Sequence, residues 1–223
     1  ALSLAVLLAG YGIMPLALVQ LAAFIAALAL AVFLVGRHLA RPVFSPHWRV
    51  YRRLLLAGLP FALSSIFIFV YDGTATIFLS LFHGDFVTGL YSGAANFVRI
   101  FGILPASLVA AVLPAMSQLW PGSSSAWLTL FRRSLKYLLI AALPVAVGLA
   151  LVSEELVLLV LGQEYAGSAS ILRLVAWLII FVFLNHGLTT GLISIDRERT
   201  YLRIVGLALV VNGVANLLLI PGW

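Results

Sequence analysis

The chain alternates long apolar runs with short polar segments. Residues 51–120 contain two such runs, joined by the polar segment 83–88. A transmembrane helix needs about 20 consecutive apolar residues, and both runs are longer. We therefore predict a hairpin of two membrane-spanning helices, at 54–82 and 88–119. At a rise of about 1.5 Å per residue the first spans roughly 43 Å, so it must tilt, kink near Pro60 or continue past the hydrocarbon core.

Further apolar runs predict helices on both sides of this hairpin. We expect spans at about 16–36, 135–152, 168–195 and 200–220, and a short interfacial piece at 156–161. The basic, amphipathic segment 127–137 is expected to lie along the membrane surface before the next span begins. Residues 1–10 are interpreted as the end of a helix, separated from the next by the turn formers at 11–15; the alternative is one kinked helix over 1–36.

Composition narrows the class of protein. Hydrophobic residues make up 64% of the 223 residues and charged residues 9%, whereas soluble domains carry roughly 25% charged residues. The continuous apolar runs fit helices and not the alternating strands of a barrel. We predict an all-α, polytopic transmembrane helical bundle of about six to seven helices. Because the chain contains no cysteine, disulfides and thiolate metal sites are excluded.

The basic residues predict the orientation of the bundle. All of the 13 Lys and Arg residues except Arg99 and Arg173 fall in segments 37–53, 120–136 and 195–203, and the intervening connections 83–88 and 153–167 have none. Basic loops mark the cytoplasmic side, so the first arm of the hairpin is expected to run outward. The same pattern accounts for the net charge of +6 without a nucleic-acid partner. We expect Arg173 to extend to the nearby headgroups.

Two charges lie deep inside the hairpin. Asp72 and Arg99 are each roughly 15 Å from the predicted outer helix ends, near the middle of a hydrocarbon core about 30 Å thick. One interpretation is a buried ion pair that pins the two helices together. The other places one or both side chains in a water-filled cavity, and the two are compatible if the pair opens during transport.

In a cavity, this pair would have a defined chemistry. The Arg99 guanidinium would bind the phosphate oxygens of an anionic head group, and Asp72 would be its counter-charge or a proton or cation site. Tyr71, Ser92 and Asn96 flank the two charges, and Asn96 shares a helical face with Arg99. These five residues are the candidate substrate-binding set. Catalytic, cofactor and metal motifs are absent from the sequence, so we predict neither an enzyme nor a cofactor or metal site.

Several motifs of the hairpin form a recognisable series. They are Gly58-Leu59-Pro60, Asp72, Gly89-Leu90-Tyr91-Ser92-Gly93-Ala94, Arg99, Leu104-Pro105 and Leu113-Pro114-Ala115-Met116-Ser117. Residues 161–166 (LGQEYA) and 212–221 (NGVANLLLIP) extend the series. The chain resembles the bacterial polysaccharide or oligosaccharide flippases, relatives of the lipid II flippase and of MATE-type exporters.

The resemblance implies a transporter of roughly 12 to 14 helices in two lobes, related by a pseudo-two-fold axis along the membrane normal. Residues 1–36 would end the N-terminal lobe, 37–53 would be a basic cytoplasmic linker, and 54–223 would form a truncated C-terminal lobe. The chain is then expected to be a fragment of a longer protein of the bacterial cytoplasmic (inner) membrane. Its expected activity is the flipping of undecaprenyl-pyrophosphate-linked oligosaccharide by alternating access, for surface polysaccharide export.

Two alternatives stay open. The first is a drug or cation antiporter of the same superfamily. The second, from another class, is a membrane-embedded transferase that acts on lipid-linked sugars. The expected partners are a lipid-linked oligosaccharide and the phospholipid bilayer, with proton or sodium coupling as a further expectation.

Overall fold

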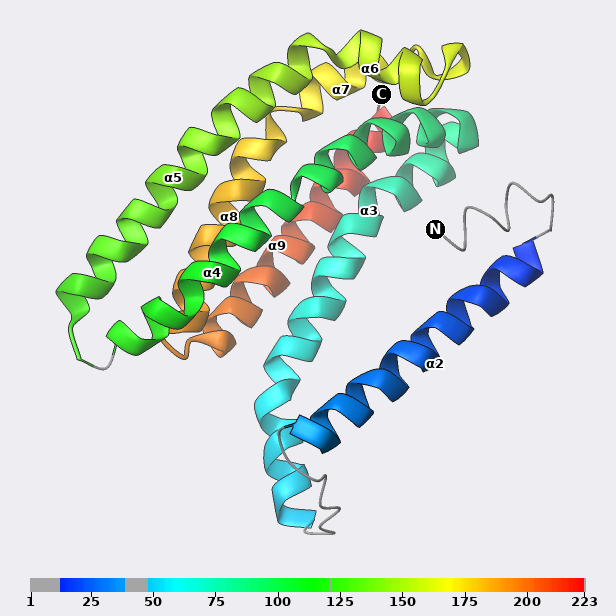
Figure 1. The fold of residues 1–223 in the computed structure, drawn as a ribbon. Helices are drawn as coiled ribbons and strands as arrows, with labels where there is room; N and C mark the ends of the chain where they lie inside the picture. The colour runs from blue at the N-terminus through cyan, green and yellow to red at the C-terminus, as the bar shows by residue number, and fades with distance from the viewer. Residues whose placement is uncertain (1–12, 39–47, 121, 223) are drawn as a thin grey trace. The chain divides into compact units, whose positions relative to one another are not determined.

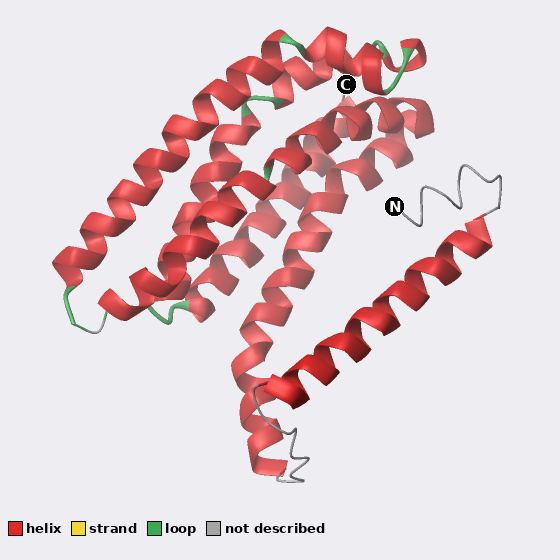
Figure 2. Ribbon diagram, in the orientation of Figure 1, coloured by secondary structure: helices red, strands yellow, loops and turns green. Residues whose placement is uncertain are grey.

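The computed structural model describes residues 13–38, 48–120 and 122–222 (Figure 1). Throughout these ranges the ordered elements are helices, with no strand (Figure 2), which confirms the all-α prediction. The helix end expected at 1–10, the first two residues of the turn expected at 11–15 and much of the expected linker, 39–47, lie outside the described residues. Residues 13–15, expected in the turn, are already helical.

The chain divides into two compact units, Ala1–Arg52 and Arg53–Trp223. In the first unit, α2 (Ile13–His38) occupies the run expected at 16–36, and its segment Leu18–Leu34 is apolar. The boundary falls at the end of the expected linker segment. The assignment of the units to two lobes of a transporter stays a prediction.

A helical hairpin spans the start of the second unit, and its helix begins at Trp48, five residues before the unit boundary. Helix α3 (Trp48–Phe101) reverses at Gly84, whose φ of 81° and ψ of 176° are not helical. This positive φ favours glycine. Ser80 Oγ donates a hydrogen bond to Asp85 Oδ1 at 3.0 Å across the reversal, and Thr88 Oγ1 donates one to the Gly84 carbonyl at 2.9 Å. The predicted hairpin is therefore present, but its turn is one residue and not the whole of 83–88.

We refer to residues 48–83 as the first arm and 85–101 as the second arm. The first arm begins at Trp48, so the last residues of the expected linker are helical. The second arm ends at Phe101, and α4 (Ile103–Leu119) follows after Gly102. The span predicted at 88–119 is thus interrupted. Pro105 explains the position of the break, because it has no N–H to donate to the carbonyl of Phe101 four residues earlier.

Helix α5 (Ser124–Leu151) differs from the prediction for its region. Ser123 caps its start, accepting a hydrogen bond from the Ala126 N–H at 3.3 Å. The segment 127–137 and the span predicted at 135–152 form one continuous helix, because no helix-terminating residue separates them. The separate surface segment expected there is wrong. Val152 ends α5, and the short α6 (Ser153–Val160) matches the piece expected at 156–161.

The span predicted at 168–195 is broken. Helices α7 (Ser168–Val175) and α8 (Leu178–Ser194) meet at a bend of 42°. Neither Gly nor Pro marks the bend: Ala176 is fully buried there, and the next residue, Trp177, is exposed. Packing of the small Ala176 against the core accompanies the bend, which a sequence pattern does not reveal. Helix α9 (Glu198–Leu219) lies close to the range expected at 200–220, and a short 3₁₀ helix, η2 (Ile220–Gly222), follows it.

The core of the second unit is formed by the second arm of α3 together with α5, α6, α7 and α8, and α4 packs against α5 and α8. Small residues of α5 such as Ala142 and Ala146 are fully buried, beside Ile179 and Phe183 of α8. In α8, Gly187 and Gly191 face α5 closely: a Cβ at Gly187 would lie 2.6 Å from Leu135 Cδ2, and one at Gly191 would lie 2.5 Å from Phe131 Cε2. Glycines four residues apart allow helices in membranes to approach each other in this way.

Three helical stretches of the described chain are long and apolar enough to cross a membrane: Trp48–Leu119, Ser124–Leu151 and Glu198–Gly222. The bent pair α7–α8 is a fourth if it counts as one span. In the second unit, the α4–α5 and α8–α9 connections lie at one end, and the Gly84 turn and α6 at the other (Figure 1). Two of the three basic connections thus share one end, as the charge pattern predicts for a common membrane side.

Candidate functional site

The second arm of the hairpin is held by two of the motifs noted in the sequence. A Cβ at Gly93 would lie 2.9 Å from Leu161 Cδ1, and one at Gly89 would lie 3.8 Å from Tyr165 Cε1. Ser168 Oγ donates a hydrogen bond to the Leu90 carbonyl at 2.8 Å. The motif at 89–94 therefore packs against the segment 161–168. Gly93 provides the close approach, and this contact fixes the rotation of the arm about its axis.

This rotation determines which residues the second arm leaves uncovered. Ala94, Phe97 and Val98 are buried in the core, whereas Asn96 and Arg99 are exposed and Ser92 is half-buried. At about 100° per residue, Ser92, Asn96 and Arg99 fall within roughly 60° of one another on the helix. Arg99 Nη1 donates a hydrogen bond to Asn96 Oδ1 at 3.4 Å. The structure thus brings these three predicted residues together on one face.

Tyr71 and Asp72 are exposed on the first arm. They form no ion pair with Arg99 in the part of the chain that the structure describes, so the pinned hairpin of the first interpretation is not formed here. The two charges are nevertheless close enough for Arg99 to act electrostatically on the Asp72 carboxyl. Counted from Gly84, Asp72 lies about 18 Å and Arg99 about 22 Å along the helices, a difference of less than one turn.

Tyr91 is a residue that the sequence reasoning did not select. Its half-buried phenol lies within the electrostatic reach of Arg99, Tyr71 and Asp72. The motif at 89–94 contains it, but an aromatic residue in an apolar helix is more often a packing residue, so the pattern alone does not distinguish it. We call the set Tyr71, Asp72, Tyr91, Ser92, Asn96 and Arg99 the hairpin polar cluster.

The cluster combines one guanidinium, one carboxylate, two phenols, an amide and a hydroxyl. A guanidinium binds phosphate oxygens through two parallel hydrogen bonds, and the neutral groups can donate to and accept from sugar hydroxyls. Polar groups at this depth in apolar helices are costly unless they face protein or water. No group of three metal-binding side chains occurs within 13–38, 48–120 and 122–222. The arrangement is therefore suited to binding a polar, anionic ligand.

Comparison with known proteins identifies the family. The model of the polysaccharide biosynthesis protein family matches residues 1–120. This match includes both arms, α4 and all six members of the hairpin polar cluster, whereas the motifs at 161–166 and 212–221 lie beyond it. No curated protein and no solved structure matches the chain. With more than half of its length matched and its helices long and apolar enough to cross a bilayer, the chain belongs to the polysaccharide biosynthesis protein family of membrane proteins.

Proposed function

We propose that the protein flips an undecaprenyl-pyrophosphate-linked oligosaccharide across the bacterial cytoplasmic membrane by alternating access, for surface polysaccharide export. The observation that carries this proposal is the exposed Arg99, which lies about 22 Å along an apolar helix from the Gly84 turn, within the family match. A permanent cation at that depth, where an ionisable side chain is costly, is explained by an anionic ligand.

Each member of the cluster has a role in this proposal. Arg99 binds the pyrophosphate, and its hydrogen bond to Asn96 orients the guanidinium. Tyr71, Tyr91 and Ser92 contact sugar hydroxyls. Asp72 balances the charge of Arg99 when the substrate is absent, and the substrate phosphate takes over that role when it binds.

The same geometry accommodates ion coupling as a part of the proposal. A carboxylate that loses its cationic neighbour to a phosphate is left uncompensated in a medium of low polarity, and it then favours binding a proton or a sodium ion. In this scheme Asp72 binds the coupling ion while Arg99 binds the substrate. The exposure of Asp72 also supports the second candidate function, a cation antiporter in which Asp72 is the essential residue and Arg99 is secondary.

Replacing Arg99 tests the proposal and separates it from the antiporter. In cells that depend on the complete protein, Arg99→Ala is expected to abolish polymer export and to leave lipid-linked oligosaccharide on the cytoplasmic face of the membrane. Arg99→Lys keeps the charge but loses two-point binding, so a partial loss is expected. Arg173→Ala is the matched control, because Arg173 is also exposed on a helix of the second unit and lies outside the cluster.

The amount of protein in the membrane is measured for each variant, so that a folding defect is not taken for a transport defect. Normal export by Arg99→Ala at normal protein levels would exclude Arg99 from the mechanism. If Asp72→Asn blocked transport while Arg99→Ala did not, the antiporter would be the better description.

A further inference from the structure

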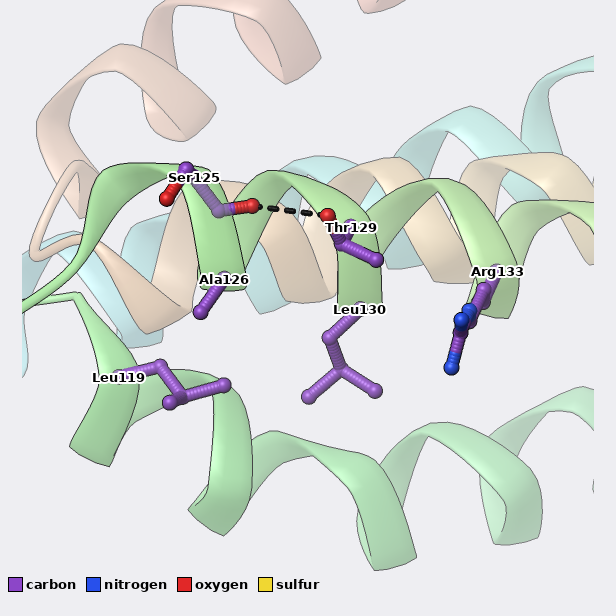
Figure 3. Close-up of a pocket in the computed structure, with 6 residues that line it drawn as sticks. All are labelled: Leu119, Ser125, Ala126, Thr129, Leu130 and Arg133. Carbon is purple, nitrogen blue, oxygen red and sulfur yellow. Dashed lines mark hydrogen bonds between the residues drawn. The ribbon is translucent and has the colours of Figure 1, made fainter.

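A second polar site lies where α4 ends and α5 begins, at the end of the second unit away from the Gly84 turn. An open surface cavity of about 380 Å³ lies there, lined by Leu119 of α4 and by Ser125, Ala126, Thr129, Leu130 and Arg133 of α5. Figure 3 shows Leu119, Ala126 and Leu130 around its apolar interior, and Arg133 extending from α5 on the same side. The cavity therefore joins an apolar interior to a cationic margin.

The polar groups at the margin favour an anion. Thr129 Oγ1 donates a hydrogen bond to the Ser125 carbonyl at 2.9 Å (Figure 3). The Arg133 guanidinium makes no hydrogen bond to the other five lining residues (Figure 3). Arg132 and Lys136 add positive charge on the same stretch of α5.

Aromatic residues next to the cavity place it at the membrane surface. Trp120 and Trp127 are in edge contact, with ring centroids 5.5 Å apart, and Trp127 is stacked on Phe131 at 5.0 Å. Trp127 Nε1 donates a hydrogen bond to Ser194 Oγ at 3.0 Å, which fixes the ring. Tryptophan is enriched at the level of lipid headgroups, with the polar edge in the interface and the ring in the apolar region.

We propose that this cavity binds an anionic phospholipid, with its phosphate at Arg133 and the upper part of an acyl chain against Leu119, Ala126 and Leu130. By the charge pattern of the loops, the lipid comes from the cytoplasmic leaflet. A lipid fits better than a free phosphate, because half of the lining is apolar and a soluble anion gains nothing from it. The site is separate from the hairpin polar cluster, and the inference does not depend on the flipping of an oligosaccharide.

Lipid binding to the purified full-length protein tests this inference. Phosphatidylglycerol is titrated onto the detergent-solubilised protein, and bound lipid is counted by native mass spectrometry, with phosphatidylcholine and inorganic phosphate as comparison ligands. Arg133→Gln is expected to weaken phosphatidylglycerol binding about tenfold, since one charge-assisted contact is lost. Arg132→Gln is the matched control: it removes the same charge one residue away, outside the cavity lining, and is expected to change binding less than about twofold.

A second variant tests the cavity without changing a charge. Ala126→Leu fills the apolar interior and is expected to weaken phosphatidylglycerol binding by a similar factor, with normal elution on size exclusion as evidence of folding. Equal losses in Arg132→Gln and Arg133→Gln would show diffuse surface charge and overturn the site. Unchanged binding in both Arg133→Gln and Ala126→Leu would also overturn it. Displacement of the lipid by millimolar inorganic phosphate would show a soluble anion site instead.

Discussion

The contact between α5 and α8 differs from the hairpin polar cluster in how closely its side chains pack. At the first, glycines and alanines let two helices approach until an added Cβ at Gly191 would lie 2.5 Å from a ring atom of Phe131. At the second, Asp72 and Arg99 are exposed and make no ion pair with each other in the described chain. One region gains stability from dense packing, and the other keeps charged groups free to interact.

The difference shows how a membrane protein separates stability from function. Helix association in lipid depends on van der Waals contact, because the bilayer is as apolar as the side chains. Charged side chains add little to such packing and are costly at depth, so they are retained for their chemistry. A substitution at the interface should therefore affect folding, and one in the cluster should affect transport.

Gly191→Ala is expected to have the largest effect of the following substitutions. The new methyl group meets the Phe131 ring, which is held by its stacking on Trp127, so we expect a loss of about 1–3 kcal/mol in the free energy of unfolding. Equilibrium unfolding in mixed detergent micelles measures it. Gly187→Ala should cost less, because its nearest atoms are the terminal methyl groups of Leu135 and Leu138 and not a stacked ring.

Gly213→Ala in α9 is the control, since nothing lies within 4 Å of its added Cβ. Alanine favours the helix over glycine by up to about 1 kcal/mol, so this variant should be neutral or stabilising. Destabilisation of Gly191→Ala and Gly213→Ala by equal amounts would contradict the close contact at Phe131.

Asp72→Asn is expected to lower export about tenfold, the equivalent of about 1.4 kcal/mol, because Arg99 loses its neighbouring counter-charge. The exchange Asp72→Arg with Arg99→Asp distinguishes the two interpretations of the pair. If the charges only stabilise the hairpin, the exchange should restore export; if Arg99 binds the substrate at its own position, export should stay lost. Recovery to the wild-type rate would argue against substrate binding at Arg99.

Trp127→Phe tests the packed contact between α5 and α8 again, with a smaller expected effect on the free energy of unfolding. It removes the hydrogen bond to Ser194 but keeps an aromatic ring against Phe131, so the free energy of unfolding should fall by about 0.5–1 kcal/mol. Trp177→Phe is the matched control, because Trp177 is exposed. The same unfolding assay applies, and equal losses in the two variants would rule out a contribution from this bond.

Asn96→Ala should have the smallest effect, about a twofold loss of export. The Arg99–Asn96 hydrogen bond is long, at 3.4 Å, and exposed, so it orients the guanidinium only weakly. Export at limiting substrate supply is the sensitive measurement. A loss as large as that of Arg99→Ala would mean that Asn96 itself contacts the substrate.

The sequence predicted the features that depend on hydrophobicity and charge. Long apolar runs indicated the helices, and the polar segment at 83–88 located the hairpin turn at Gly84. Length and composition do not reveal where a continuous apolar run bends. The break between α7 and α8 occurs at Ala176–Trp177, where no residue type marks it.

The candidate site was predictable as a set of residue types, but its arrangement was not. Asp72 and Arg99 were notable because they are charges in apolar helices, and helical spacing placed Asn96 beside Arg99. Tyr91 was missed, since its place depends on how the glycines at 89 and 93 turn the second arm against residues 161–168. Such rotation comes from tertiary contacts and not from periodicity.

The one-residue reversal at Gly84 has a consequence for any moving part of this protein. No flexible loop joins the two arms, and Ser80 donates a hydrogen bond to Asp85 across the turn. One arm therefore cannot shift along the other without breaking this turn. The relative height of Asp72 and Arg99 is therefore set by the hairpin itself. Under the proposed alternating access, this short turn favours movement of the two arms as one unit, with Asp72 and Arg99 kept at similar heights.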